Sequence, residues 1–256
     1  MLYIQKKTPS YATQQELTRV KASPAWRAIA NDDTVSIRNQ FDLLEKSTIR
    51  SDLLIEQHHL CAYCMRRIKN DGSSTHIEHW KPLSKEKESA LDYNNFLAVC
   101  DGGSGAAVSG RRILCCDAHK GDTEELLVDP RNEAMMNCIT YTRNGLIQFV
   151  NNGTYSQDAL AKIVRDINVT LQLNGKLDVN NNVVQDTSTQ IVKGRRDAWM
   201  QAEAIVNRLK KDHRFSSHSL SVEIRKIENA DPRFEYAGVI LFRLKRYYES
   251  LRRQGM

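Results

Sequence analysis

The sequence lacks the features that characterise membrane, secreted, repeat and coiled-coil proteins. No apolar run among its 256 residues approaches the roughly 20 residues that a membrane-spanning helix needs. The first ten residues, Met1 to Ser10, lack the apolar stretch of a secretory signal peptide. No internal repeat and no coiled-coil heptad pattern is present. We therefore expect a cytoplasmic protein with no membrane segment, built as one large or two modest domains.

The six cysteines are too unevenly spaced to indicate a disulfide framework, and no signal peptide accompanies them. Disulfides are rare in the cytosol, where cysteines more often serve as metal ligands or as buried thiols. The cysteines are therefore candidate ligands of a metal ion, with buried free thiols as the alternative.

Positive charge is concentrated in the last quarter of the chain. The whole sequence has 37 Lys and Arg against 31 Asp and Glu, whereas residues 191–256 have 15 against 8. Such a region suits a polyanionic partner, although surface charge that only aids solubility is equally common. Arg243, Lys245 and Arg246 are its candidate phosphate ligands. The alternatives are an amphipathic helix that packs one stripe on the body, or a surface that docks a protein.

Apolar spacing predicts mostly helix on either side of a central irregular region. One helix is expected from Ser36 to Leu54, with capping side chains in residues 31–34. Further helices are expected at 158–171, 191–211, 220–227 and 234–253, with a polar interruption at 175–189. Residues 138–150 predict a β-hairpin that turns at Asn144-Gly145. The glycine-rich stretch 101–112 predicts an exposed, mobile loop.

A pair of cysteines, Cys61 and Cys64, is separated by two residues, and Cys100, Cys115 and Cys116 follow downstream. Two thiolates at this spacing can share one tetrahedral Zn²⁺ ion. Cys100 and Cys116 are the natural remaining ligands, with Cys115 in reserve. A thiol redox pair is the weaker interpretation, because no βαβ pattern surrounds these cysteines.

Between the cysteines lies a cluster of polar residues that suits hydrolysis. Residues 76–79, His-Ile-Glu-His, predict a strand in which Glu78 and His79 face opposite ways, so that one can reach a metal ion and the other a water. Asn95 can hydrogen-bond an imidazole and fix which ring nitrogen is free to accept a proton. Downstream, residues 116–121 offer Asp117 or His119 as a metal ligand and Lys120 as a cation for a phosphate.

Taken together, these segments resemble an HNH endonuclease with a ββα-metal site. The quoted segments are CAYC at 61–64, IEHWKP at 77–82, LDYNNFLAVC at 91–100 and CDAHKGD at 116–122. More narrowly, they resemble the HNH subunit (PtuB-like) of Septu-type anti-phage systems, which also accompanies some retrons. The resemblance implies an α+β fold with N-terminal helices in residues 1–60, a zinc-braced nuclease core in 61–135, and a hairpin and basic helical region in 136–256.

The resemblance also implies roles for individual residues. His79 would be the general base, oriented by Asn95. Glu78 would hold one catalytic Mg²⁺ or Mn²⁺ ion together with either Asp117 or His119. Lys120 would contact the scissile phosphate or stabilise the fold. The zinc ion would be structural.

Partners follow from the same resemblance. Septu-type subunits act with an oligomeric PtuA-like ATPase, and retron versions add a reverse transcriptase and its DNA. The chain has no Walker-type glycine loop, so ATP hydrolysis would have to come from such a partner. The substrate could be DNA or tRNA. The alternative from another class is a non-catalytic zinc module that binds nucleic acid or a protein.

Overall fold

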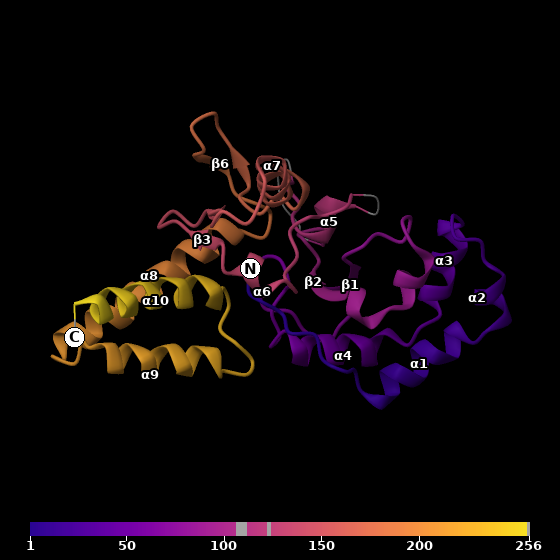
Figure 1. Cartoon of the computed structure of the whole chain (residues 1–256), viewed down its shortest axis with the longest axis horizontal. Helices are drawn as coiled ribbons and strands as arrows, with labels where there is room; N and C mark the ends of the chain where they lie inside the picture. The colour runs from indigo at the N-terminus through magenta and orange to yellow at the C-terminus, as the bar shows by residue number, and fades with distance from the viewer. Residues whose placement is uncertain (106–111, 122–123, 255–256) are drawn as a thin grey trace.

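The computed structural model describes residues 1–105, 112–121 and 124–254 of the chain. Figure 1 shows short helices at one end, short strands near the middle and longer helices at the other end. The first half contains α1 (Tyr11–Lys21), α2 (Pro24–Ala28), α3 (Thr34–Asp42), α4 (Lys46–Glu56), β1 (Thr75–His79), the 3₁₀ helices η1 (Lys87–Leu91) and η2 (Tyr93–Asn95), β2 (Phe96–Cys100) and α5 (Asp117–Lys120).

The second half contains α6 (Glu133–Met136), β3 (Ile139–Tyr141), β4 (Ile147–Phe149), α7 (Gln157–Arg165), the π-helical turn η3 (Asp166–Thr170), β5 (Lys176–Leu177), β6 (Val183–Gln185), α8 (Ile191–Lys211), α9 (Ser217–Glu228) and α10 (Ala237–Arg253). Helices combined with short antiparallel strand pairs make an α+β fold, as the sequence predicts. Among the described helices, none has the length and apolar character needed to cross a membrane.

The predicted helix from Ser36 to Leu54 is in fact two helices, α3 and α4. The Asp33 side chain caps α3 by accepting a hydrogen bond from the Ser36 amide, as residues 31–34 indicated. The chain then breaks, and Glu45 caps α4 through the Ser47 amide. The physical reason is visible in the apolar spacing, because Leu44 and Ile49 are five residues apart and cannot share one helical stripe.

The central strand pair joins two segments that are far apart in the sequence. β1 and β2 run antiparallel, with His79 opposite Phe96 and Thr75 opposite Cys100. All five residues of β2 are buried, and α4 contacts both strands. The helix α5 follows further along the chain and bonds back to β1 through Lys120. Two strands and a short helix are thus held together in one small unit.

The predicted hairpin is present as β3 and β4, with Ile139 opposite Phe149. Its turn differs in detail from a two-residue Asn-Gly turn, because only Gly145 has a positive φ, of 85°. The Thr142 amide donates to the Leu146 carbonyl, and the Gly145 amide donates to the Thr142 carbonyl. This pattern is a type I turn followed by a glycine bulge. A side chain at Gly145 would also collide with the Val192 carbonyl of α8.

The C-terminal helices follow the predicted order, and α10 packs on both α8 and α9. Helix α7 ends at Arg165 and continues as the π-helical turn η3, short of the predicted Leu171.

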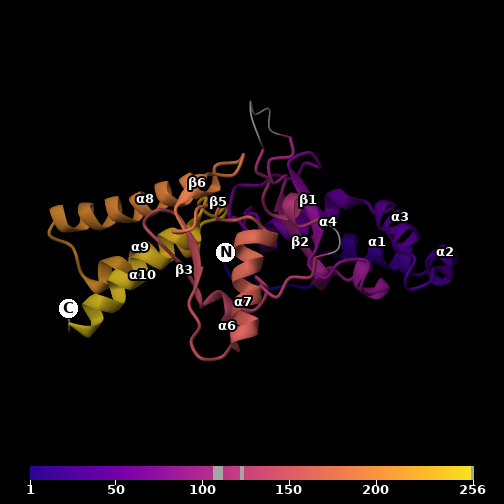
Figure 2. The same ribbon diagram turned by 90° about the horizontal axis from the view of Figure 1, so that it is seen from above.

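The polar interruption at 175–189 forms the small hairpin β5–β6. In the predicted loop 101–112, residues 106–111 lie outside the described residues. Figure 2 shows α8 and α10 running to the end of the molecule opposite α1–α3. The segment boundaries at 60 and 135 stay predictions.

Candidate metal centre and catalytic residues

Four cysteine sulfurs meet in the interior of the molecule. Cys61 and Cys64 lie in the turn after α4, Cys100 ends β2, and Cys116 is the residue just before α5. The Met65 amide donates to the Cys61 carbonyl, which closes the turn between the first two ligands. All four residues are buried, and their Sγ atoms lie within 4.8 Å of one another.

The sulfur separations suit one tetrahedral metal ion. The Sγ–Sγ distances are 3.9 Å for Cys61–Cys116, 3.7 Å for Cys64–Cys100 and 3.8 Å for Cys100–Cys116. Four thiolates about 2.3 Å from a zinc ion would be about 3.8 Å apart. A disulfide needs about 2.05 Å, so these sulfurs are not bonded to one another. The predicted set Cys61, Cys64, Cys100 and Cys116 is therefore a group that could hold a metal ion such as zinc.

Cys115 lies beside the cluster but is not one of the four. Its Sγ is 3.5 Å from the Thr189 hydroxyl and 3.7 Å from the Gly102 carbonyl oxygen. Arg66 is a second neighbour. Burial lowers the pKa of Arg66, but the thiolates of Cys100 and Cys64 outweigh it and raise the pKa above its ordinary value. A guanidinium here would offset the net negative charge of four thiolates around a divalent ion.

Glu78 is the centre of a second buried group, on β1. Its Oε1 accepts hydrogen bonds from the Lys120 ammonium at 2.6 Å and from the Tyr63 hydroxyl at 3.1 Å. The Lys120 side chain is 1% exposed and also donates to the His79 carbonyl oxygen at 3.1 Å. Asp117, the first residue of α5, lies close enough to Glu78 to raise the pKa of its carboxyl group. Two carboxylates from β1 and α5 thus converge.

Electrostatics at this group favour a further cation. Burial, reinforced by the Asp117 carboxylate, raises the pKa of Glu78 although Lys120 acts in the opposite direction. Because both donors bind Oε1, neither uses the other oxygen, Oε2. Carboxylate oxygens are the ligands that Mg²⁺ and Mn²⁺ prefer. Glu78 and Asp117 therefore fit a divalent ion, and its charge would relieve their mutual repulsion.

The His79 ring lies on the other side of the strand, as alternation predicts. It packs edge-on against Phe41 and Phe96, with ring centroids 4.5 Å and 5.1 Å away. Its Nε2 is 3.0 Å from the Ala90 carbonyl oxygen, which can only accept a hydrogen bond. In the neutral ring the proton must therefore be on Nε2, and Nδ1 keeps its lone pair. Burial lowers the pKa of His79 to about 4, which keeps the ring neutral near pH 7.

Asn95 does not bond to the imidazole, which corrects the predicted contact. Its Oδ1 accepts from the Lys81 amide at 2.8 Å, and its Nδ2 donates to the carbonyl oxygens of Lys81 and Ser89 at 2.9 and 3.0 Å. These bonds tie the end of β1 to η1, and η1 carries Ala90. Asn95 therefore acts on His79 indirectly, through the backbone that bears the Ala90 carbonyl.

The two alternatives for the second metal ligand have different surroundings. Asp117 lies beside Glu78, whereas the exposed His119 places its Nδ1 3.1 Å from the Thr170 carbonyl oxygen in η3. The geometry favours Asp117, and a role for His119 in binding the ion stays a prediction.

The basic residues of α10 are mostly engaged within the fold. Arg243 bonds to Glu203 and to the Tyr247 hydroxyl, and its guanidinium stacks on Trp199. Lys245 forms an ion pair with Glu228 at 2.7 Å. Arg246 lies over the ring of Phe242. The amphipathic interpretation of this helix is confirmed by its buried stripe, and contact with nucleic acid stays a prediction.

No protein-family model matches the chain, and no curated protein matches it significantly.

Sequence reasoning missed Tyr63 and Ala90. Tyr63 is fully buried and bonds to Glu78, and burial together with Glu78 raises the pKa of its hydroxyl. Its place inside the Cys-x-x-Cys turn was the available signal, since a tyrosine between two buried ligands is itself buried. Ala90 acts through its carbonyl, which no side-chain pattern can reveal.

Proposed function

We propose that the chain is a metal-dependent endonuclease of the HNH type, which hydrolyses phosphodiester bonds in nucleic acid. The observation that carries the proposal is the convergence of Glu78 and Asp117 on a β1–β2–α5 unit that also carries His79, on the opposite face of β1, and that ends at the four-cysteine cluster. A purely structural zinc unit needs neither the carboxylates nor the histidine.

Each residue then has a chemical role. Nδ1 of His79 is the basic nitrogen and would take the proton of the attacking water, because Ala90 holds the proton on Nε2. Glu78 and Asp117 would hold a Mg²⁺ or Mn²⁺ ion, which supplies charge stabilisation at the phosphate oxygens and the leaving group. Lys120 holds Glu78 in place and adds positive charge. The cysteine cluster would hold the end of β2 and the start of α5 in a fixed position relative to each other.

The proposed setting is that of the resembled proteins, an effector subunit of a Septu-type or retron-associated anti-phage complex. A PtuA-like ATPase would then be its partner, and a reverse transcriptase with its DNA would join in a retron.

A non-catalytic zinc module is the alternative, and one observation favours it. Lys120 and Tyr63 already satisfy one oxygen of Glu78, so the buried carboxylate has partners without any divalent ion. Such a module would bind nucleic acid or a protein and would cleave nothing.

The test is cleavage of plasmid DNA and of tRNA with Mg²⁺ or Mn²⁺ added, by wild type, Asp117→Asn and His119→Ala. We expect wild type and His119→Ala to cut, and Asp117→Asn to lose at least about a hundredfold in rate, since it weakens the ion's site. The reverse order would assign the ligand to His119. Wild-type protein that contains zinc and cuts neither substrate with either ion would contradict the function.

A further inference from the structure

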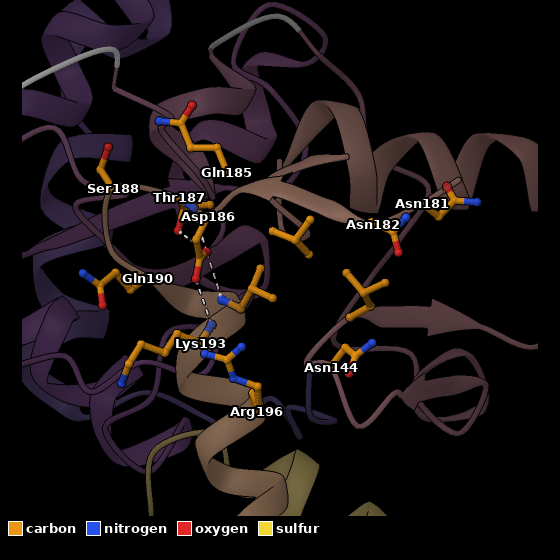
Figure 3. Close-up of a pocket in the computed structure, with 13 residues that line it drawn as sticks. Asn144, Asn181, Asn182, Gln185, Asp186, Thr187, Ser188, Gln190, Lys193 and Arg196 are labelled. Atoms are coloured by element: carbon orange, nitrogen blue, oxygen red, sulfur yellow. Dashed lines mark hydrogen bonds between the residues drawn. The ribbon is translucent and has the colours of Figure 1, made fainter. Parts of the chain in front are cut away.

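A polar pocket lies away from the metal centre, at the start of α8. Its volume is about 630 Å³, which is in the range of about 300–1,000 Å³ for small-molecule sites. The tips of two hairpins form one side: Asn144 comes from the β3–β4 turn, and Asn181 and Asn182 come from the β5–β6 turn. Figure 3 shows Asn144 and Asn182 on that side, with Lys193 and Arg196 on α8.

Several polar groups of the pocket are already used by the fold. The Asp186 carboxylate accepts from the amides of Thr187, Val192 and Lys193 at 2.7, 3.1 and 2.8 Å. Asp186 therefore occupies the donors at the N-terminus of α8, which excludes that helix end as an anion site.

Other polar groups of the pocket face solvent. Asn144 and Arg196 are exposed, and within residues 1–105, 112–121 and 124–254 no hydrogen bond or ion pair is formed by either side chain. Lys193 forms an ion pair with Asp197 at 2.7 Å, whereas Arg196 forms none within the described residues. Arg196 is therefore the cation of the pocket that is available to a ligand. Leu146, Val183 and Val192 add an apolar surface between the polar groups.

This combination of groups matches one class of ligand. A carboxamide offers a donor and an acceptor side by side, as the edge of a nucleobase does. A guanidinium binds phosphate through two parallel hydrogen bonds, and an apolar surface suits the face of a flat ring. We propose that the pocket binds one nucleotide unit, with its base against the carboxamides of the hairpin tips and its phosphate at Arg196.

The pocket wall is bonded to the segment that leads into the metal centre. The Ser188 amide donates to the Ile113 carbonyl at 2.8 Å, and the Ile113 amide donates to the Ser188 hydroxyl at 3.1 Å. Cys116 and Asp117 follow Ile113 within four residues. A nucleotide held here would lie beside the same backbone that positions the proposed catalytic ion. If the nucleotide belongs to a substrate strand, the inference rests on the proposed nuclease function. A free nucleotide would make the pocket a regulatory site.

The test variant is Asn144→Ala/Arg196→Gln. Both side chains are exposed, and neither backbone has a positive φ, so the fold should persist. Asn181 and Gln190 are left unchanged because their φ angles, 59° and 53°, are strained for most residues. The matched control is Asn39→Ala/Arg27→Gln, which removes the same groups from exposed positions on α3 and α2.

Binding is measured by fluorescence anisotropy without divalent ions, using labelled single-stranded DNA and RNA oligonucleotides and labelled AMP, CMP, GMP and UMP. We expect the test variant to bind at least about tenfold more weakly than wild type to one of these probes. The control should bind as wild type does. Preference for oligonucleotides would identify a substrate strand as the source, and equal or tighter binding of a mononucleotide would identify a free nucleotide.

The two proposals fail separately. Equal binding of all probes by wild type and test variant would overturn the pocket assignment, even if the protein cleaves nucleic acid. A tenfold loss of mononucleotide binding would support the pocket even if wild type cleaved no substrate.

Discussion

At the residue scale, the site depends on buried polar groups that are fixed by backbone atoms. The Ala90 carbonyl sets the tautomer of His79, and Asn95 secures the segment that carries Ala90. The sequence predicted His79, Glu78 and Asn95 as candidate catalytic residues because such polar groups are concentrated between the cysteines. It could not supply the contacts, because a backbone carbonyl leaves no trace in residue type.

Burial of His79 predicts a pH dependence of stability. The pKa of His79 is lowered to about 4, whereas an unfolded histidine titrates near 6.5. The folded state thus binds the proton more weakly, so stability is complete above about pH 6.5 and is lost as the pH falls toward 4. Between pH 7.5 and 5.5 this group should contribute a loss of about 1 kcal/mol.

Urea unfolding of wild type and of His79→Gln at these two pH values measures that contribution. Acid effects on the cysteine cluster are common to both proteins and cancel in the difference. We expect the free energy of unfolding of wild type to fall by about 1 kcal/mol more than that of the variant. Equal falls would show that His79 is accessible and titrates normally.

At the element scale, a short strand pair and a one-turn helix have little stability of their own. The four cysteines join the turn after α4, the end of β2 and the start of α5 at one point. The Cys-x-x-Cys pattern allowed this set to be predicted, because two thiolates at that spacing favour two more. The sequence also favoured Cys116 over the adjacent Cys115, and the structure places Cys116, not Cys115, in the group of four.

Loss of one sulfur ligand should therefore loosen the whole unit. We expect Cys64→Ser to lose bound zinc and about 4 kcal/mol or more of stability, which lowers the melting temperature by roughly 10 °C. Cys138→Ser is the control, since Cys138 is also buried but lies outside the cluster. Zinc content and thermal melting measure both variants. Unchanged zinc content in Cys64→Ser would refute the metal site.

The crossing of α8 and α10 gives a second prediction at this scale. A Cβ atom at Gly194 would collide with the ring of Tyr236, which is 8% exposed. Alanine in a helix gains about 1 kcal/mol over glycine, but overpacking costs about 1–3 kcal/mol. The collision involves a confined ring, so we expect Gly194→Ala to destabilise the protein by about 1–2 kcal/mol.

Gly105→Ala is the control for this effect, because the nearest atom to its Cβ would be at an ordinary distance of 3.5 Å. Chemical denaturation of both variants measures the difference. A Gly194→Ala protein that is more stable than wild type would mean that the two helices can separate at their crossing point.

At the scale of the whole molecule, the parts that follow local rules were predictable. The order of the C-terminal helices and the hairpin follow from periodicity and turn residues, whereas the α+β class was implied by the resemblance. The π-helical turn after α7 and the pocket at α8 depend on contacts between distant segments. The excess of positive charge in residues 191–256 suits a polyanion, yet Arg243 and Lys245 are paired with glutamates inside the fold. Charge counting alone cannot distinguish these two uses.

The proposed function requires His79 to act as a base on nucleic acid, on a strand pair that the cysteine cluster holds in place. Its most direct test compares cleavage of plasmid DNA and tRNA by wild type, His79→Ala and His76→Ala, with Mg²⁺ or Mn²⁺ and with zinc content checked in each. His76 lies on the same strand and faces the other way, so it controls for the loss of an imidazole. We expect His79→Ala to keep its zinc and lose cleavage, while His76→Ala cuts as wild type does. Full cleavage by His79→Ala would contradict this role of His79.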